Sequence, residues 1–240
     1  MINRQNLCLD ATLDNGAANL ALDEALLDAR EIGTWGQTLR FWEPKEYFVV
    51  VGYANQVRRE VNLDECKRLQ IPVLRRCSGG GTVVQGPGCL NYTLVLDSET
   101  PFETISTTNF NVMERNRKAL ENVLKRTVQV RGYTDLTVDN LKFSGNAQRR
   151  KRSAFIFHGT FLLNFDLGLV EKLLPMPSME PDYRQNRSHS AFITNLNISA
   201  DAVKQTMMAE WNAGQKTLEL PDWEKLLRER YERDEWNLKC

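Results

Sequence analysis

The feature that most constrains this chain is a run of three consecutive glycines between two apolar segments. Residues 71–74 and 82–84 have the composition of short strands, and Arg75 and Arg76 stand before the glycine run at 79–81. Because glycine has no Cβ, the backbone N–H groups of such a loop can approach a ligand closely. Guanidinium groups have a donor geometry that suits carboxylate or phosphate. The pattern predicts an anion-binding loop, although a plain glycine-rich turn explains these residues alone equally well.

The composition predicts a soluble protein with one sizeable core. Of the 240 residues, 42% are hydrophobic and 26% are charged, a balance typical of globular domains. Lys plus Arg and Asp plus Glu both total 31, so no net charge favours a nucleic-acid or membrane partner. No apolar run reaches the length of a membrane span, and the N-terminus lacks a signal-peptide core. The five cysteines are scattered without C-x-x-C spacing, which favours a reduced, cytoplasmic compartment without a zinc site or disulfide framework.

Apolar periodicity predicts a chain rich in strands. Strand patterns occupy residues 7–13, 38–42, 48–51, 71–74, 89–96, 128–130, 136–138, 154–157 and 160–165. Helical patterns occupy residues 17–30, 63–69, 110–124, 167–174 and 200–211. Because these helices do not alternate regularly with the strands, the order favours an α+β fold with a mixed or antiparallel sheet over a Rossmann-type α/β fold.

The remaining segments suggest how the chain is divided. Residues 175–190 are polar and punctuated by proline, which is typical of a long loop that folds over a site. No linker composition interrupts the chain before its last quarter. We therefore expect one domain over residues 1–215, followed by a charged, helical and peripheral tail over residues 216–240.

A second candidate site surrounds Lys142, which lies between Leu141 and Phe143 and precedes Ser144-Gly145-Asn146. A lysine at a strand edge is usually a solvated residue that blocks edge pairing. The small polar turn expected after it would let the ammonium face a cavity, where it could hold a phosphate or polarise an acyl group. From these residues alone, the solvated role is the commoner of the two.

Two further features carry weaker signals. Residues 149–152 are four cations in a row, which is typical of a solvated turn. Such a run could also recognise an acidic partner, with nucleic acid a weaker option because no aromatic residues are interleaved. His158 and His189 are the only histidines, which excludes a multi-histidine metal site. A lone histidine in a strand is more often a hydrogen-bonded core residue than a catalyst.

Taken together and in order, these motifs resemble lipoate–protein ligase A and the wider biotin/lipoate ligase and octanoyltransferase superfamily. The matching segments are Asn19-Leu20-Ala21-Leu22-Asp23-Glu24-Ala25-Leu26-Leu27, Leu39-Arg40-Phe41-Trp42, the Arg75-Arg76-x-Ser78-Gly79-Gly80-Gly81 loop, Asp135-Leu136, Lys142-Phe143-Ser144-Gly145-Asn146-Ala147-Gln148 and His158-Gly159-Thr160. The resemblance implies a biotin/lipoate ligase-like catalytic domain, with a mixed, largely antiparallel sheet flanked by helices.

The resemblance also implies a two-step reaction. A fatty carboxylate, lipoate or octanoate, attacks the α-phosphorus of ATP, with Mg²⁺ expected, to give acyl-AMP and pyrophosphate. A lysine amine of an acceptor lipoyl domain then displaces AMP. The expected acceptor is a glycine-cleavage H-like protein or the lipoyl domain of a 2-oxoacid dehydrogenase. Both steps build negative charge, which fixed cations and backbone N–H groups stabilise.

The residues expected to carry this chemistry follow from the matched motifs. Lys142 is the expected catalytic cation, and Asp135 either orients it or faces the metal. The expected substrate and adenylate contacts are Arg75, Arg76, Ser78, Gly79, Gly80, Gly81, Thr82, Val83, Ser144, Asn146, His158, Gly159 and Thr160. The acyl tail needs an apolar slot, for which Trp42, Val51 and Val83 are candidate walls. For Trp42, an ordinary core position is an equally good interpretation.

The chain departs from the family pattern in two places. Many relatives follow the glycine loop with a His-Asp pair, where this chain has Gln85-Gly86, so the phosphate or metal contact made there differs. The tail is too short for the extra C-terminal domain of full-sized bacterial ligases. The activity then needs a separate accessory subunit, or the chain is a compact ligase that acts alone.

Two other functions fit the same resemblance. An octanoyltransferase takes its acyl group from acyl carrier protein without ATP, commonly through a cysteine thioester. Cys77 and Cys89 are the only cysteines near the expected site, and residues 90–239 contain none, which favours the ligase. For Cys89, a small apolar residue on a core strand is the commoner role. The third option is a non-catalytic protein that binds an acyl group or a partner on the same fold.

Overall fold

An eight-stranded mixed sheet forms the centre of the computed structural model, which describes residues 5–98, 104–215 and 219–239. Its strand order is β11-β1-β2-β6-β10-β9-β8-β7. β1 pairs in parallel with β11 and β2, and every other neighbouring pair in this sheet is antiparallel, as predicted. The strands are β1 (Asn6–Asp10), β2 (Thr38–Trp42), β6 (Cys89–Asp97), β7 (Gln129–Arg131), β8 (Asp135–Val138), β9 (Leu141–Arg150), β10 (Ala154–Leu162) and β11 (Ala213–Gln215).

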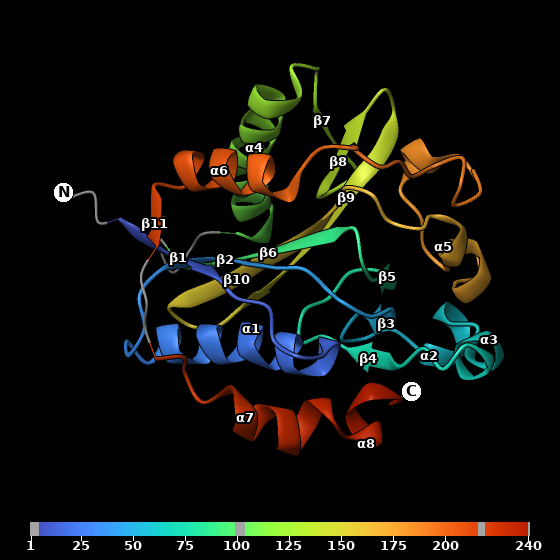
Figure 1. Cartoon of the computed structure of the whole chain (residues 1–240), viewed down its shortest axis with the longest axis horizontal. Helices are drawn as coiled ribbons and strands as arrows, with labels where there is room; N and C mark the ends of the chain where they lie inside the picture. The colour runs from blue at the N-terminus through green and yellow to red at the C-terminus, as the bar shows by residue number, and fades with distance from the viewer. Residues whose placement is uncertain (1–4, 99–103, 216–218, 240) are drawn as a thin grey trace.

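A second, three-stranded sheet carries the glycine loop. Its order is β4-β3-β5, from β3 (Phe48–Val51), β4 (Val73–Arg75) and β5 (Val83–Gln85). Because β4 and β5 lie on opposite sides of β3, the glycine loop between them has to cross the end of β3. The small sheet lies beside the large one, together with α2 (Val57–Glu60), α3 (Leu63–Arg68) and α5 (Gly168–Leu173) (Figure 1).

Helices cover both faces of the large sheet. α4 (Ile105–Leu124) and α6 (Ala200–Glu210) lie on one face, and α1 (Gly16–Glu31) lies on the other (Figure 1). Asn15 caps α1 by accepting a hydrogen bond from the backbone N–H of Ala18. Among the described residues, no helix is long and apolar enough to cross a membrane.

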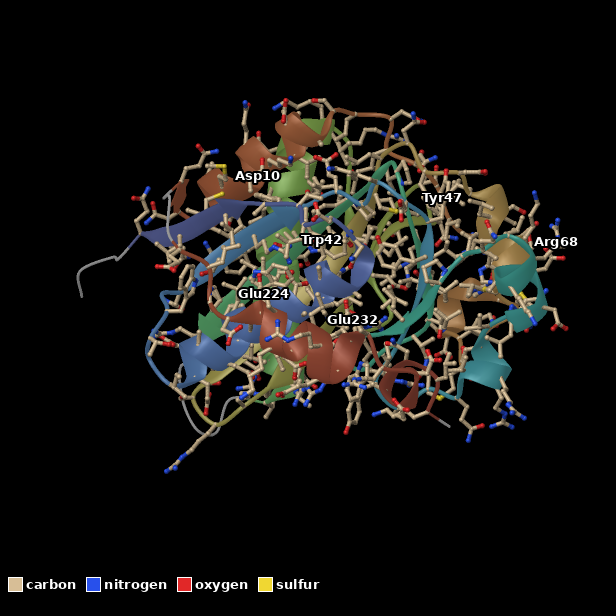
Figure 2. The ribbon with its side chains drawn as sticks, turned by 60° about the horizontal axis from the view of Figure 1, so that its bottom comes forward. Asp10, Trp42, Tyr47, Arg68, Glu224 and Glu232 are labelled. Atoms are coloured by element: carbon tan, nitrogen blue, oxygen red, sulfur yellow. The ribbon has the colours of Figure 1, made fainter. Side chains whose placement is uncertain are left out.

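The C-terminal segment covers the outer side of α1. It consists of α7 (Trp223–Leu226), the π-helix η2 (Leu227–Tyr231) and α8 (Asp234–Asn237). Figure 2 shows this segment, marked by Glu224 and Glu232, lying across α1. Tyr231 is 0% exposed, and its hydroxyl donates to the buried Glu24 at 2.7 Å. The described tail is therefore helical, and Tyr231 anchors it against α1.

The structure differs most from the sequence-based expectation at β9. Residues 141–150 form one ten-residue strand, where a turn was expected at Ser144-Gly145-Asn146. Pairing with β8 on one side and β10 on the other supplies backbone partners for these polar residues. β10 likewise runs unbroken through Gly159, where two strands were expected. The segment 181–184 adds a short 3₁₀ helix, η1 (Asp182–Arg184), to the long loop.

Truncating Tyr231 tests whether the C-terminal segment belongs to the folding unit. We expect Tyr231→Ala to lower the free energy of unfolding by roughly 3–5 kcal/mol, because it removes a fully buried ring and a charge-assisted hydrogen bond to Glu24. Leu238→Ala, at a residue that is 42% exposed, should change it by less than about 0.5 kcal/mol. Urea denaturation of both variants measures the free energy of unfolding. Equally small effects of the two substitutions would show that the C-terminal segment is not part of the folding unit.

Candidate active site

The glycine loop is built around the guanidinium of Arg76. Its Nη2 donates to the carbonyl oxygens of Gly79 at 2.6 Å and Gly81 at 2.7 Å. Its Nε donates to Ser78 Oγ at 3.1 Å. Burial lowers the pKa of Arg76 to about 10, which still leaves it charged at neutral pH. Arg76 therefore shapes the loop from inside.

The outer side of this loop is open. A Cβ built on Gly79 or Gly81 would meet no atom within 4 Å. Gly80, by contrast, has φ +85 and packs against Gly52, where an added Cβ would overlap the Gly80 carbonyl. The loop is thus fixed on one side by Arg76 and Gly52 and exposed on the other, as a ligand-binding backbone has to be.

Arg75 has a different place from the one expected. Its side chain is fully buried and binds two segments behind the glycine loop. It donates to the carbonyl oxygens of Gly52, Tyr53 and Asn55, and to those of Trp236 and Lys239 in the C-terminal segment. Asn237 Oδ1 accepts from the Arg75 backbone N–H at 3.0 Å. Arg75 is therefore a structural cation that ties the tail to the loop, rather than an anion ligand.

Lys142 and Asp135 form an ion pair on neighbouring strands. Lys142 Nζ lies 2.8 Å from Asp135 Oδ1, and both side chains remain partly exposed. The hydroxyl of Tyr183, from η1, donates to Asp135 Oδ2 at 2.7 Å. A Cβ on Gly145 would lie 2.9 Å from Lys142 Nζ, so this glycine makes room for the ammonium. Both carboxylate oxygens of Asp135 are thus engaged, one by β9 and one by η1.

Alternation along β9 and β10 separates the matched motif residues into two groups. Gly145 and Ala147 pair with Thr160 and His158, on the face that carries α1 and the glycine loop. The ammonium of Lys142 reaches this same face at Gly145. Because successive side chains of a strand point to opposite faces, Ser144, Asn146 and Gly159 belong to the α4 face. The expected adenylate contacts by Ser144 and Asn146 are therefore replaced by scaffold contacts.

Asn146 belongs to a hydrogen-bonded chain in the core. Tyr92 donates its hydroxyl hydrogen to Asn146 Oδ1 at 2.6 Å, and Asn116 Nδ2 donates to the Tyr92 oxygen at 2.7 Å. Trp211 Nε1 donates to Asn116 Oδ1 at 2.9 Å. Gly159 lies directly against the Asn146 amide, so an added Cβ there would overlap it. This chain joins β9, β6, α4 and the end of α6.

Ser78 and His158 connect the glycine loop to buried charges on α1 and β2. Ser78 Oγ lies 2.5 Å from His158 Nε2, and His158 Nδ1 lies 3.6 Å from Asp23 Oδ2. Asp23 accepts from Arg40 at 2.5 Å. Burial opposes ionisation of Asp23, but Arg40 and His158 hold its pKa below the usual value. Arg76 Nε also donates to Ser78 Oγ, so this serine links the Arg76 guanidinium to the His158 imidazole.

The exit of the loop is neutral and closed by hydrogen bonds. Gln85 Nε2 donates to Thr160 Oγ1 at 2.6 Å, and Thr160 Oγ1 donates to Asn91 Oδ1 at 2.5 Å. Asn91 Nδ2 donates back to Gln85 Oε1 at 3.0 Å. A Cβ on Gly86 would overlap the ring of Tyr47, so the room for a carboxylate at position 86 is filled. The space around Gln85-Gly86 is thus filled by hydrogen-bonded side chains and by the Tyr47 ring.

The expected acyl-pocket walls lie in the core. Val51 is fully buried and packs with the small sheet and α5. Trp42 is buried and stacks on Phe48, with ring centroids 6.5 Å apart. Val83 is only half-buried, and the buried hydroxyl of the adjacent Thr82 has no hydrogen-bond partner. The structure thus gives Trp42 and Val51 core positions, whereas Thr82 and Val83 lie at the end of the open loop.

Comparison with known proteins decides the family. The model of the lipoyl protein ligase A/B catalytic domain matches residues 15–212, which is most of the chain. The chain belongs to this family. It is therefore an enzyme of the group that contains lipoyl ligases and octanoyltransferases.

The relatives carry both activities in their names. Octanoyltransferase LipM of Clostridioides difficile is 27% identical over 93% of this chain and 95% of its own. Lipoate-protein ligase A subunit 1 of Thermoplasma acidophilum is 25% identical over 97% of this chain and 95% of its own. The fold matches a crystal structure of lipoate-protein ligase A bound with ATP, with a TM-score of 0.84, 23% identity and coverage of 98% and 99%. A bipartite lipoate protein ligase of Thermoplasma acidophilum matches with a TM-score of 0.85, 22% identity and coverage of 98% and 97%.

The cysteines of this lipoyl ligase/octanoyltransferase family member are buried. Cys8, Cys66, Cys77 and Cys89 are free thiols in the described part of the chain, and Cys240 lies outside it. Burial raises the pKa of Cys77 and of Cys89 to about 12. Burial thus disfavours the thiolate form of both side chains.

The cation run at 149–152 is largely used within the fold. Arg149 pairs with Glu24 at 2.8 Å, and Lys151 pairs with Asp28 at 2.6 Å. Arg150 donates to Thr108 on α4. These cations fasten the end of β9 and the following turn to α1 and α4, so the run is not a free basic patch.

Sequence reasoning missed Tyr183 and the role of Asp23. Tyr183 lies in a polar, proline-rich loop whose composition gives no sign of a functional side chain. Asp23 sits with Glu24 among the apolar residues of a helical stripe, and a carboxylate in such a stripe signals a buried partner. That signal was available, whereas the partners Arg40 and His158 depend on the tertiary fold.

Gly159→Ala tests the packing of β10 on Asn146. We expect a loss of roughly 1–3 kcal/mol in the free energy of unfolding, because the added Cβ displaces the Asn146 amide from its hydrogen-bonded chain. Gly79→Ala is the matched control, since its Cβ would point into open space. Thermal denaturation compares the two, and a Gly159→Ala protein as stable as the control would contradict this packing.

Proposed function

We propose that this chain is a lipoate– or octanoate–protein ligase. It would form acyl-AMP from the fatty acid and ATP and then acylate a lysine of an acceptor lipoyl domain. The observation that carries the proposal is the Lys142 ammonium, held by Asp135 on the same face as the open glycine loop, while the four described cysteines are buried. Membership of the family makes both steps plausible chemistry for this fold.

In the first step the carboxylate oxygen of the fatty acid attacks the α-phosphorus, and pyrophosphate leaves. Negative charge develops on the phosphoryl oxygens, where Lys142 can offset it and the exposed backbone of Gly79 and Gly81 can donate hydrogen bonds. The acyl tail would lie along Thr82 and Val83, beside the loop. Because these groups are fixed before the substrate arrives, little reorganisation is needed in the transition state.

In the second step the acceptor lysine amine attacks the acyl carbonyl, and AMP leaves with the bonding electrons. The amine must be neutral to attack, so its proton is lost before or during this step. The leaving AMP phosphate carries the developing charge, which again falls near Lys142. One fixed cation thus serves both steps.

In the described ranges, no group of three or more His, Cys, Asp and Glu side chains is arranged to bind a metal ion. Asp135 is engaged by Lys142 and Tyr183. The Mg²⁺ expected for adenylation would therefore enter with the nucleotide, bound mainly by phosphate oxygens and water, as this ion prefers.

An ATP-independent octanoyltransferase is the second candidate, favoured by the relatives named octanoyltransferase LipM. A thioester route needs a cysteine near the acyl carbonyl. In this chain the two cysteines closest in sequence to the loop, Cys77 and Cys89, are buried thiols with raised pKa values. For either candidate, we propose an H-like protein or a dehydrogenase lipoyl domain as the acceptor. This chain would act on it alone or together with a separate accessory subunit.

One assay separates the candidates. The protein is incubated with an apo lipoyl domain and either octanoate or lipoate plus ATP and Mg²⁺, or octanoyl-acyl carrier protein alone, and the acceptor mass is read. ATP-dependent acylation supports the ligase, and acylation only from acyl carrier protein supports the transferase. Acyl binding without either transfer would leave a binding protein. Repeating the assay with each acid shows which chain is preferred.

Lys142→Ala should lower acyl-AMP formation by at least about a hundredfold, the scale seen when one charge-stabilising donor is lost. Lys118→Ala, at an exposed lysine of α4, is the control and should keep the normal rate. Pyrophosphate release measures the first step. Retained activity in the Lys142 variant would contradict the proposed site.

Cys89→Ser tests the thioester alternative. We expect it to keep acyl transfer within about twofold, because a buried thiol with a pKa near 12 supplies no nucleophile. Intact-mass measurement after incubation with octanoyl-acyl carrier protein should show no hydroxylamine-sensitive acyl adduct on the wild type. A stable adduct that disappears in the variant would favour the transferase.

A further inference from the structure

Tyr183 joins the long loop before α6 to the ion pair of the site. Its hydroxyl donates to Asp135 Oδ2 at 2.7 Å, while Asp135 Oδ1 lies 2.8 Å from Lys142 Nζ. The two oxygens of one carboxylate are thus divided between a neutral donor from the loop and the ammonium from β9. Burial and the adjacent carboxylate raise the pKa of Tyr183, so the phenol keeps its proton.

The ring of Tyr183 is held from several sides. It packs on Phe192 with ring centroids 5.2 Å apart, and the Arg131 guanidinium lies 5.6 Å from its centroid. The β7–β8 turn lies beside the ring, since a Cβ built on Gly132 would come within contact distance, 3.6 Å, of Tyr183 Cε1. The hydroxyl is therefore aimed at Asp135 by packing that does not involve Asp135 itself.

The same loop is bonded to the backbone of Lys142. The Lys142 N–H donates to the Phe192 carbonyl at 2.9 Å, and the Thr194 N–H donates to the Lys142 carbonyl at 2.9 Å. Inside the loop, Arg187 donates to the carbonyls of Tyr183 and Arg184, which fixes the turn that carries Tyr183. Loop and lysine are thus joined twice, through the main chain and through Asp135.

We propose that Tyr183 is a positioning residue for Lys142, acting through Asp135. By occupying Oδ2, its hydroxyl limits Asp135 to one contact with the ammonium and keeps that ammonium against Gly145, facing the glycine loop. Without the hydroxyl, the carboxylate is free to turn and offer both oxygens to Lys142. The ammonium would then be neutralised more completely and drawn away from the charge it has to stabilise. This inference rests on the proposed role of Lys142.

The first test is kinetic and uses a double-mutant cycle. Tyr183→Phe keeps the ring on Phe192 and removes only the hydroxyl. We expect the rate of acyl-AMP formation to fall about tenfold, the usual value of one charge-assisted hydrogen bond, with the KM for the fatty acid changed less than twofold. In an Asp135→Asn background the same substitution should change the rate less than twofold, because the carboxylate through which the Tyr183 hydroxyl acts on Lys142 is then absent.

Tyr133→Phe is the matched control, since that tyrosine is 89% exposed and lies in the turn between β7 and β8. It should leave the rate unchanged. A wild-type rate in Tyr183→Phe would overturn the inference. So would a tenfold loss that persists in the Asp135→Asn background, because the hydroxyl would then act by general support of the loop.

The second test does not depend on the reaction. Competitive acetylation with acetic anhydride, read by mass spectrometry, compares Lys142 with the exposed Lys118 in each protein. We expect Lys142 to be labelled several-fold more slowly in Tyr183→Phe, and the difference to vanish when Asp135→Asn is added. An unchanged labelling ratio would overturn the inference. Absence of ATP-dependent acyl-AMP formation by the wild type would instead sink the ligase proposal, while the labelling still decides the role of Tyr183.

Discussion

The antiparallel pairing of β10 with both β6 and β9 decides where the functional side chains point. β10 is paired along its whole length with β6, from Ala154 opposite Asp97 to Leu162 opposite Cys89. Its pairing with β9 puts His158 beside Ala147 and Thr160 beside Gly145. Because a slip of one residue would exchange the two faces, this register separates the site from the hydrogen-bonded core around Asn146. The open loop, the lysine and the neutral exit all depend on it.

Buried charges fasten the elements that surround this register. Asp23 and Glu24, neighbours on α1, bind Arg40 on β2 and Arg149 on β9. Glu24 also binds Arg230 of the C-terminal segment, at 2.6 Å. Such groups are expensive to bury singly, so loss of one partner leaves another unpaired. Helix α1 therefore joins the sheet to the C-terminal segment. Arg75 in turn bonds that segment to the strand that leads into the glycine loop.

Much of this could be predicted, because the relevant signals are local. The helix at α1, the central strands and the glycine loop follow from periodicity and glycine chemistry, and the order of motifs indicated the family. The ten residues of β9 could not be predicted as one strand, because their polar composition is typical of a turn. They form a strand because β8 and β10 supply hydrogen-bond partners for their backbone. The different uses of Arg75 and Arg76 could not be predicted either, because only the tertiary fold brings the C-terminal carbonyl oxygens to Arg75 and those of the glycine loop to Arg76. Tyr183 acts across 48 positions of sequence, which no local pattern reports.

The ring of Tyr47 beside Gly86 has a consequence for how this loop exit can change over time. An aspartate introduced at position 86 would collide with that ring, and a smaller residue introduced at 47 would leave a void beneath a glycine. Each single step is unfavourable, and only the two together give a packed arrangement. We therefore expect substitutions at positions 47 and 86 to be coupled rather than additive.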